Sequence, residues 1–145
     1  MSTETRPRVV LVNRSFVKRD DNKLLIIKRS PHDRYAPNKW EVPGGKLDSG
    51  QDLTHAQERE VLEETGLLVD QVERMAFVES YVIGEGPYTG LPYVAIFGIT
   101  KVAGGQLSMS EEHSDYAWVS YNELFHFDLT YEVRKAAIVM ERHLV

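Results

Sequence analysis

A helix is predicted over residues 51–65, and strand-like segments lie on both sides of it in the sequence. The segment consists largely of good helix formers, and Gly66 stands where a glycine commonly ends a helix. Ser49 and Asp52 have the spacing of a capping box, which predicts that the helix begins near these residues. A helix flanked by strands indicates a sheet with helices packed on it.

The predicted strands are short runs of apolar and β-branched residues bounded by turn residues. We expect them at residues 9–12, 16–17, 24–27, 40–47, 72–83, 92–102 and 116–119. Residues 20–23 look like the turn of an opening hairpin. Pro43-Gly44-Gly45 is expected to break the segment 40–47, and Gly104-Gly105 is expected to start a turn.

A second helix is predicted over residues 130–144, because Val133, Ala137, Met140 and Leu144 fall on one stripe at helical spacing. The order of elements is therefore strands, helix, strands, helix. This order predicts an α/β fold with a mixed β-sheet.

Length and composition narrow the class of protein. A chain of 145 residues fits one domain, which we expect to span residues 1–145. The chain has no cysteine, which excludes disulfides and cysteine metal sites. The formal net charge of −5 argues against nucleic acid polymers as partners. No apolar stretch approaches the roughly 18 residues that span a bilayer. We therefore expect no membrane association, no secretory signal and a cytoplasmic location.

The predicted helix carries acidic residues on the face that should be buried. Leu53 and Ala56 share a sector with Glu60, Glu63 and Glu64 at about 100° per residue. Like charges on a partly buried patch repel, and a divalent cation such as Mg²⁺ compensates such a patch well. The alternative is a solvated acidic face, which the three glutamates alone leave about equally plausible.

The segment around this helix resembles the Nudix box, G-x5-E-x7-R-E-U-x-E-E-x-G-U, where U is a bulky aliphatic residue. The matching residues lie at fixed spacing over 23 of the 145 positions: Gly45, Arg59, Glu60, Glu63, Glu64, Gly66 and Leu67. A match at several positions with fixed spacing is a strong signal. One position departs, because Gln51 stands where the box has its first glutamate. Glutamine accepts hydrogen bonds but has no charge, so we expect no direct ionic role for Gln51.

The resemblance implies the Nudix fold, an α/β/α sandwich, and a hydrolase that cuts a diphosphate linkage. By resemblance, Glu60, Glu63 and Glu64 are the metal ligands, and Arg59 orients the neighbouring glutamates. The implied cofactor is Mg²⁺, with Mn²⁺ as an alternative.

The remaining candidate residues come from the loops and strands near the box. For the general base we expect Glu112 first and Glu111 second, with a solvated acidic turn as the alternative. His113 is a candidate neighbour of the base, although a single histidine in a loop is more often exposed, and exposure is what we expect. The candidates for substrate binding are Gly44 and Gly45, whose backbone can approach the substrate, and the basic residues Lys28, Arg29 and Lys46. Trp40, Tyr81 and Tyr93 are candidates for stacking on a base, although packing within the fold is the more common role of such residues.

The sequence indicates the reaction, hydrolysis of a diphosphate linkage, more clearly than it indicates the substrate. The residues downstream of the box match no subfamily marker: for example, Val82 and Ile83 stand where the ADP-ribose type has a proline. We expect a small nucleotide substrate, a nucleoside triphosphate cut to the monophosphate and pyrophosphate. The alternatives are an ADP-ribose or nucleotide-sugar pyrophosphatase, and a nucleotide-binding module that has lost catalysis. The resemblance also makes a homodimer an expectation.

Overall fold

The computed structural model describes residues 8–48 and 50–145, without the side chains of residues 74–80. Its strands are β1 Val10–Lys18, β2 Leu24–Arg29, β3 Trp40–Glu41, β4 Gly44–Lys46, β5 Leu67–Val82, β6 Pro92–Gly105 and β7 His113–Val119. Its helices are α1 Leu53–Thr65, α2 Tyr121–Leu124, α3 Tyr131–Val139 and α4 Glu141–Leu144. No helix among the described residues is both long and apolar enough to cross a membrane.

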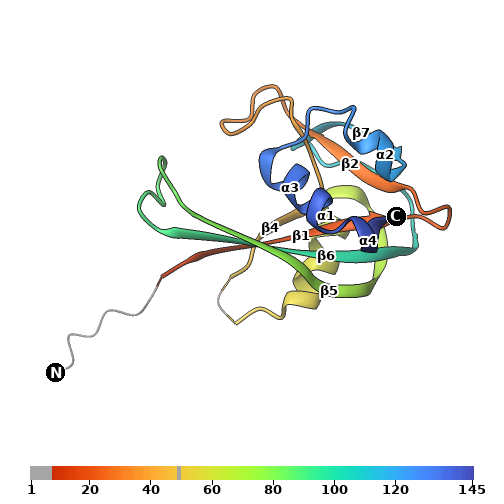
Figure 1. Cartoon of the computed structure of the whole chain (residues 1–145), viewed down its shortest axis with the longest axis horizontal. Helices are drawn as coiled ribbons and strands as arrows, with labels where there is room; N and C mark the ends of the chain where they lie inside the picture. Colours follow the sequence, from red (N-terminus) through yellow and green to blue (C-terminus); the bar gives the residue numbers. More distant parts are fainter. Residues whose placement is uncertain (1–7, 49) are drawn as a thin grey trace.

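Within the described residues, the seven strands form one mixed sheet with the main order β3-β2-β1-β6-β5. β1 runs parallel to β6, whereas β5 runs antiparallel to β6 and β2 antiparallel to β1. β4 pairs with β1, and β7 pairs with β2 on the side away from β3. Figure 1 shows the hairpin between β5 and β6 projecting away from the helices, with the start of β1 beside it.

Two separate apolar cores lie against this sheet because successive side chains of a strand point to opposite faces. Phe16, Leu24 and Ile26 belong to a core that α2, α3 and α4 complete. Their neighbours in sequence, Val17 and Leu25, belong to a second core that includes Val61 of α1. The mixed sheet therefore lies between helices, which confirms the predicted α/β/α sandwich.

The local signals around α1 are confirmed in part. Gly66 ends the helix in a left-handed conformation, and its N–H donates to the carbonyl of Leu62. The N-cap is Asp52, whose side chain accepts from the backbone N–H groups of Thr54 and His55. The predicted capping box involves Ser49, which lies outside the described residues. The buried face of α1 is Ala56, Gln57, Val61, Glu64 and Thr65.

Both glycine pairs lie in strands. The predicted break in the segment 40–47 is confirmed between β3 and β4, but Gly44 and Gly45 themselves lie inside β4, opposite Arg14 and Asn13 of β1. Gly104 and Gly105 do not start the predicted turn, because they lie at the end of β6 and pair with the start of β5. In both places the two glycines permit a close approach of two strands.

The predicted second helix is divided. α3 ends at Val139 and α4 begins at Glu141, with Met140 between them. The predicted stripe is nevertheless buried as expected, at Val133, Ala137, Met140 and Leu144. The short helix α2, which begins with a capping box at Ser120 and Glu123, was not predicted.

Candidate active site

A cavity of about 1100 Å³ opens beside the end of α1. Its walls come from β1, β2, β4, the β5–β6 hairpin and the segment before β7. The charged residues in these walls are Arg14, Arg29, Asp33, Glu41, Lys46, Glu64, Glu85, Glu111 and Glu112. Residues far apart in the sequence thus meet around one space that both acidic and basic side chains line.

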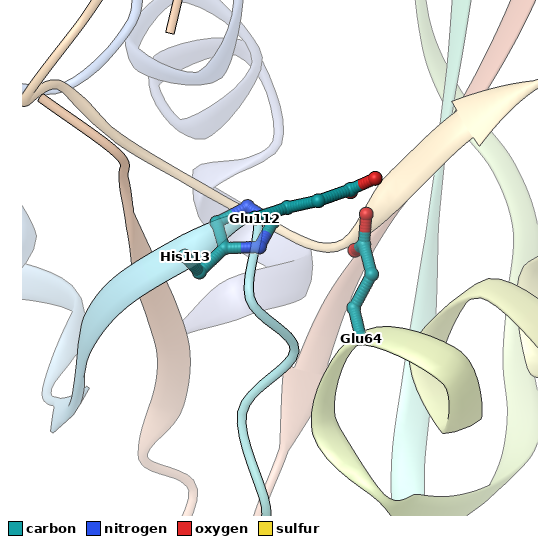
Figure 2. A group of neighbouring side chains, drawn as sticks. All are labelled: Glu64, Glu112 and His113. Atoms are coloured by element: carbon teal, nitrogen blue, oxygen red, sulfur yellow. The ribbon is translucent and has the colours of Figure 1, made fainter. Parts of the chain in front are cut away.

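Backbone hydrogen bonds hold the segment before β7 against the end of α1. The N–H of Ser110 donates to the carbonyl of Glu64, and the N–H of Ser108 donates to the carbonyl of Thr65. This attachment brings Glu112 and His113 to the side chain of Glu64. One ligand atom from each of these three residues lies within 4.8 Å of the others. Figure 2 shows the carboxylates of Glu64 and Glu112 facing each other, with the His113 ring beside them.

The strand β4 comes very close to two glutamates of α1 because it begins with two glycines. The N–H of Gly44 donates to Oε2 of Glu64 at 3.0 Å. A Cβ on Gly45 would lie only 2.7 Å from Oε1 of Glu60. A Cβ on Gly44 would lie 2.1 Å from the carbonyl oxygen of Asn13. Neither contact is tolerable, so any side chain here would displace the strand or the carboxylate.

Arg59 lies between the other two glutamates of the box. Its guanidinium is 3.5 Å from Oε1 of Glu60 and 3.6 Å from Oε1 of Glu63. The Glu63 side chain is 60% exposed, whereas Glu60 is largely covered. The three glutamates are therefore graded from the buried Glu64 to the solvated Glu63.

Burial and like charges raise the pKa values of the inner glutamates. Burial raises the pKa of Glu64 to about 8, helped by the charges of Glu41 and Glu60 and opposed by the hydrogen bond from Gly44. Burial also raises the pKa of Glu60, and the charges of Glu63 and Glu112 add to this effect. At neutral pH Glu64 therefore favours a bound proton, and a bound cation would stabilise its charged form instead.

Glu41 has the opposite environment. Its buried carboxylate accepts from Arg29 Nη1 at 3.0 Å and is 2.9 Å from Nε2 of His113, while Arg14 Nη1 lies 3.4 Å away. Burial alone would raise the pKa of Glu41. The hydrogen bond from His113 and the charges of Arg14 and Arg29 outweigh this and lower the pKa to about 2. Glu41 is therefore a permanent anion that holds two arginines and a histidine.

Arg14 and Arg29, which both contact Glu41, each contact a second carboxylate as well. Arg14 Nε donates to Glu132, which also accepts from the hydroxyl of Tyr93. Arg29 Nη2 forms an ion pair with Asp33 at 2.8 Å. Both guanidinium groups still line the cavity, so they present fixed positive charge to it.

Some of the other residues predicted to bind or stack on the substrate line the cavity, and others do not. Lys46 lines the cavity, and its ammonium lies 4.0 Å from the centre of the Tyr88 ring. Tyr81 and Tyr93 also line the cavity and stack on each other with ring centroids 4.6 Å apart. Trp40 instead packs edge-on against Phe127 in the core.

Gln51 contacts the loop before α1. The side-chain oxygen of Gln51 accepts from the backbone N–H of Asp48 at 2.8 Å, and the backbone N–H of Gln51 donates to the Asp48 carbonyl. A neutral acceptor is sufficient for this contact, which agrees with the expectation that Gln51 has no ionic role.

The expectation that His113 is exposed is wrong. Its side chain is only 3% exposed, because it lies at the start of β7 and faces Glu41. Glu41 and Arg14 were not predicted as site residues at all. Both lie on strands, and the available signal was a charged residue inside an otherwise apolar run, as in Trp40-Glu41-Val42.

Comparison with known proteins agrees with the fold and identifies the family. The NUDIX domain family matches residues 6–141. The nucleoside triphosphatase NudI of Escherichia coli O139:H28 is 30% identical over 123 residues, which cover 80% of this chain and 86% of that protein.

Two solved structures share the fold. The MutT protein of Methanosarcina mazei Go1 superposes with a TM-score of 0.78 at 23% identity, covering 97% of this chain and 98% of that one. The C. elegans Ap4A hydrolase gives a TM-score of 0.73 at 21% identity, covering 94% and 98%.

The family match over most of the chain, the relative that is 30% identical and the place of the box glutamate Glu64 at the cavity lead to one conclusion. The chain belongs to the Nudix family and is a Nudix-type pyrophosphohydrolase.

Proposed function

We propose that the protein hydrolyses a nucleoside triphosphate to the nucleoside monophosphate and pyrophosphate with the help of Mg²⁺. The observation that carries this proposal is the juxtaposition of an uncompensated carboxylate group with a cavity that also presents arginine and lysine. Glu64 and Glu112 line this cavity, and so do Arg14, Arg29 and Lys46. The similarity to a nucleoside triphosphatase supports the choice of substrate.

The chemistry of the donor set fits Mg²⁺. Mg²⁺ prefers oxygen ligands and commonly bridges carboxylates and substrate phosphates. Glu60 and Glu64 both have raised pKa values because they are buried near like charges, and a divalent cation removes this penalty. We propose that Glu60, Glu63 and Glu64 hold the ion, with Glu112 beside them.

A bound Mg²⁺ would lower the pKa of an attacking water and neutralise charge on the phosphate oxygens. Glu112 takes the proton of the water in our proposal, with Glu111 as the second candidate. Arg59 keeps the carboxylates of Glu60 and Glu63 in position between turnovers. Arg29 and Lys46 attract the phosphates, and Gly44 and Gly45 let the backbone of β4 come close to them.

We also propose that residues 1–145 form one Nudix domain. β1 lies in the centre of the sheet, and Leu144 of α4 fills the core on one face of it. Elements from both ends of the described chain thus contribute to the same core.

A substrate panel tests the proposal. Purified protein with Mg²⁺ is given nucleoside triphosphates, ADP-ribose, nucleotide sugars and diadenosine polyphosphates, and the products are separated by chromatography. We expect the triphosphates to be cut fastest. Preferential cleavage of ADP-ribose or a nucleotide sugar would contradict the substrate class, and tight binding of triphosphates without turnover would contradict catalysis.

Three variants accompany the panel. Glu63→Gln and Glu64→Gln should nearly abolish turnover while leaving the circular dichroism spectrum unchanged. Glu58→Gln changes a glutamate of α1 that belongs neither to the box nor to the cavity wall and should retain full activity. Normal Mg²⁺-dependent turnover by Glu63→Gln would contradict the proposed ligand set.

A further inference from the structure

His113 is a buried histidine with one ring nitrogen that has no partner. Nε2 is engaged with Glu41, but Nδ1 is shielded from solvent and makes no hydrogen bond within the described part of the chain. A buried polar atom without a partner is costly, so such an atom commonly indicates a bound water or ion. His113 is therefore poised to bind something at Nδ1.

The contact with Glu41 determines which nitrogen is free. A carboxylate can only accept, so in the neutral ring Nε2 carries the proton that it donates to Glu41. Nδ1 then has a lone pair. Histidines that bind metals usually donate their other N–H group to a carboxylate in this way, which fixes the tautomer and the orientation of the ring.

The surroundings of His113 supply further ligands. Glu64, Glu112 and His113 each offer an atom within 4.8 Å of the other two, and Figure 2 shows them grouped between α1 and the start of β7. Two ligands about 2.1 Å from a shared ion are at most about 4.2 Å apart. A shift of about half an ångström in flexible glutamate side chains would close this group around one ion.

We propose that His113 adds a nitrogen ligand to the divalent cation that Glu64 holds, with Glu112 beside it, and that Glu41 is the positioning residue of His113. This inference rests on the metal dependence in the proposed function and goes beyond it by adding an imidazole to a carboxylate site. Imidazole binds transition metals more readily than it binds Mg²⁺, which prefers oxygen. The site should therefore bind Mn²⁺ more tightly than Mg²⁺.

Electron spin-echo envelope modulation of the Mn²⁺-loaded protein, without nucleotide, tests the proposal directly. The wild-type protein should show the modulation of a directly coordinated ¹⁴N nucleus. His113→Asn should lose this signal, whereas His32→Asn, a change at an exposed histidine of the same cavity, should keep it. Absence of ¹⁴N coupling in the wild-type protein would overturn the proposal, whatever the variants do.

Binding constants give a second readout. His113→Asn should weaken Mn²⁺ binding at least about tenfold and Mg²⁺ binding less than about threefold, measured by calorimetry. Equal losses for both ions would contradict the imidazole ligand. Mg²⁺-dependent cleavage of nucleotides without ¹⁴N coupling would refute this inference alone. Coupling without any cleavage would refute the proposed function and leave the cation site intact.

Discussion

Glu41 and Glu64 are two buried carboxyl groups of one site whose surroundings move their pKa values in opposite directions. Glu41 has two arginines and a histidine around it, and its pKa falls to about 2. Glu64 has one hydrogen bond from Gly44 and two negative neighbours, and its pKa rises to about 8. Glu41 holds Arg14 and Arg29 in place at the cavity, whereas Glu64 remains available for a cation.

Glu64→Gln should stabilise the metal-free protein at neutral pH. The pKa of Glu64 is raised in the folded state above its ordinary 4.5, so its contribution to stability is full below pH 4.5 and is lost as the pH rises toward 8. The variant does not undergo this loss. Its free energy of unfolding at pH 7 should therefore exceed that of the wild-type protein by up to about 3 kcal/mol. Urea unfolding in EDTA at pH 5, 6, 7 and 8 measures this difference. A difference that does not grow with pH would contradict the raised pKa.

Glu41→Gln should have the opposite effect. The pKa of Glu41 is lowered in the folded state, so its stabilising contribution is present above pH 4.5 and is lost as the pH falls toward 2. Removing the charge leaves Arg14 and Arg29 without their shared partner and should cost about 3 kcal/mol at pH 7.

Urea unfolding at pH 7 measures how far Glu41→Gln lowers the free energy of unfolding. Asp33→Asn provides the control, because it removes a partly exposed partner of the same Arg29 and should cost less than about 1 kcal/mol. Equal losses in the two variants would show that Glu41 does not organise the network.

At the scale of elements, the contact between β4 and α1 joins the fold to the site. β4 pairs with β1 on one side and approaches Glu60 and Glu64 of α1 on the other. The two glycines of β4 have different neighbours, which makes their substitutions distinguishable.

Gly45→Ala should impair activity more than stability, and Gly44→Ala should impair both. The new methyl at position 45 meets the end of the flexible Glu60 side chain, so this carboxylate swings away from its place. The new methyl at position 44 meets the backbone of Asn13 and Arg14, which cannot move without separating β1 and β4. We expect Gly44→Ala to lower the free energy of unfolding by about 2 kcal/mol more than Gly45→Ala does. Thermal unfolding together with turnover checks this order, and equal stability of the two variants would contradict it.

The elements that the sequence predicts well are those with local signals. α1 has its glutamates at helical spacing and Gly66 at its end, so its position follows from neighbouring residues. The glycine pair at 104–105 was predicted to start a turn but pairs with β5, and the pair at 44–45 was predicted to break a strand but lies inside β4. A glycine that interrupts a strand and a glycine that permits two strands to approach look alike in one sequence. Only the partner strand distinguishes them.

At the scale of the whole molecule, the site is made by strand pairing that no local pattern specifies. β2 lies between β3 and β7, which brings Glu41 and His113 together across it although they are 72 residues apart. The sequence therefore predicts the box glutamates and Arg29 but not the role of Glu41, Arg14 or His113. A homodimer and a cytoplasmic location stay predictions.

The cavity is enclosed by residues from both sides of the sheet. Glu64 of α1 lines it, and so does Tyr93, which packs against the core that α2, α3 and α4 complete. The β5–β6 hairpin, which Figure 1 shows projecting away from the helices, contributes Tyr81, Tyr88 and Tyr93 to the cavity wall. The acidic end of α1 and the tyrosines thus enclose one space from two directions.

The most direct test of this account is product analysis by ³¹P NMR of a nucleoside triphosphate incubated with the protein and Mg²⁺. The account predicts the monophosphate and pyrophosphate in equal amounts, with no reaction after addition of EDTA. Formation of a diphosphate and inorganic phosphate, or turnover that continues at full rate in EDTA, would contradict it.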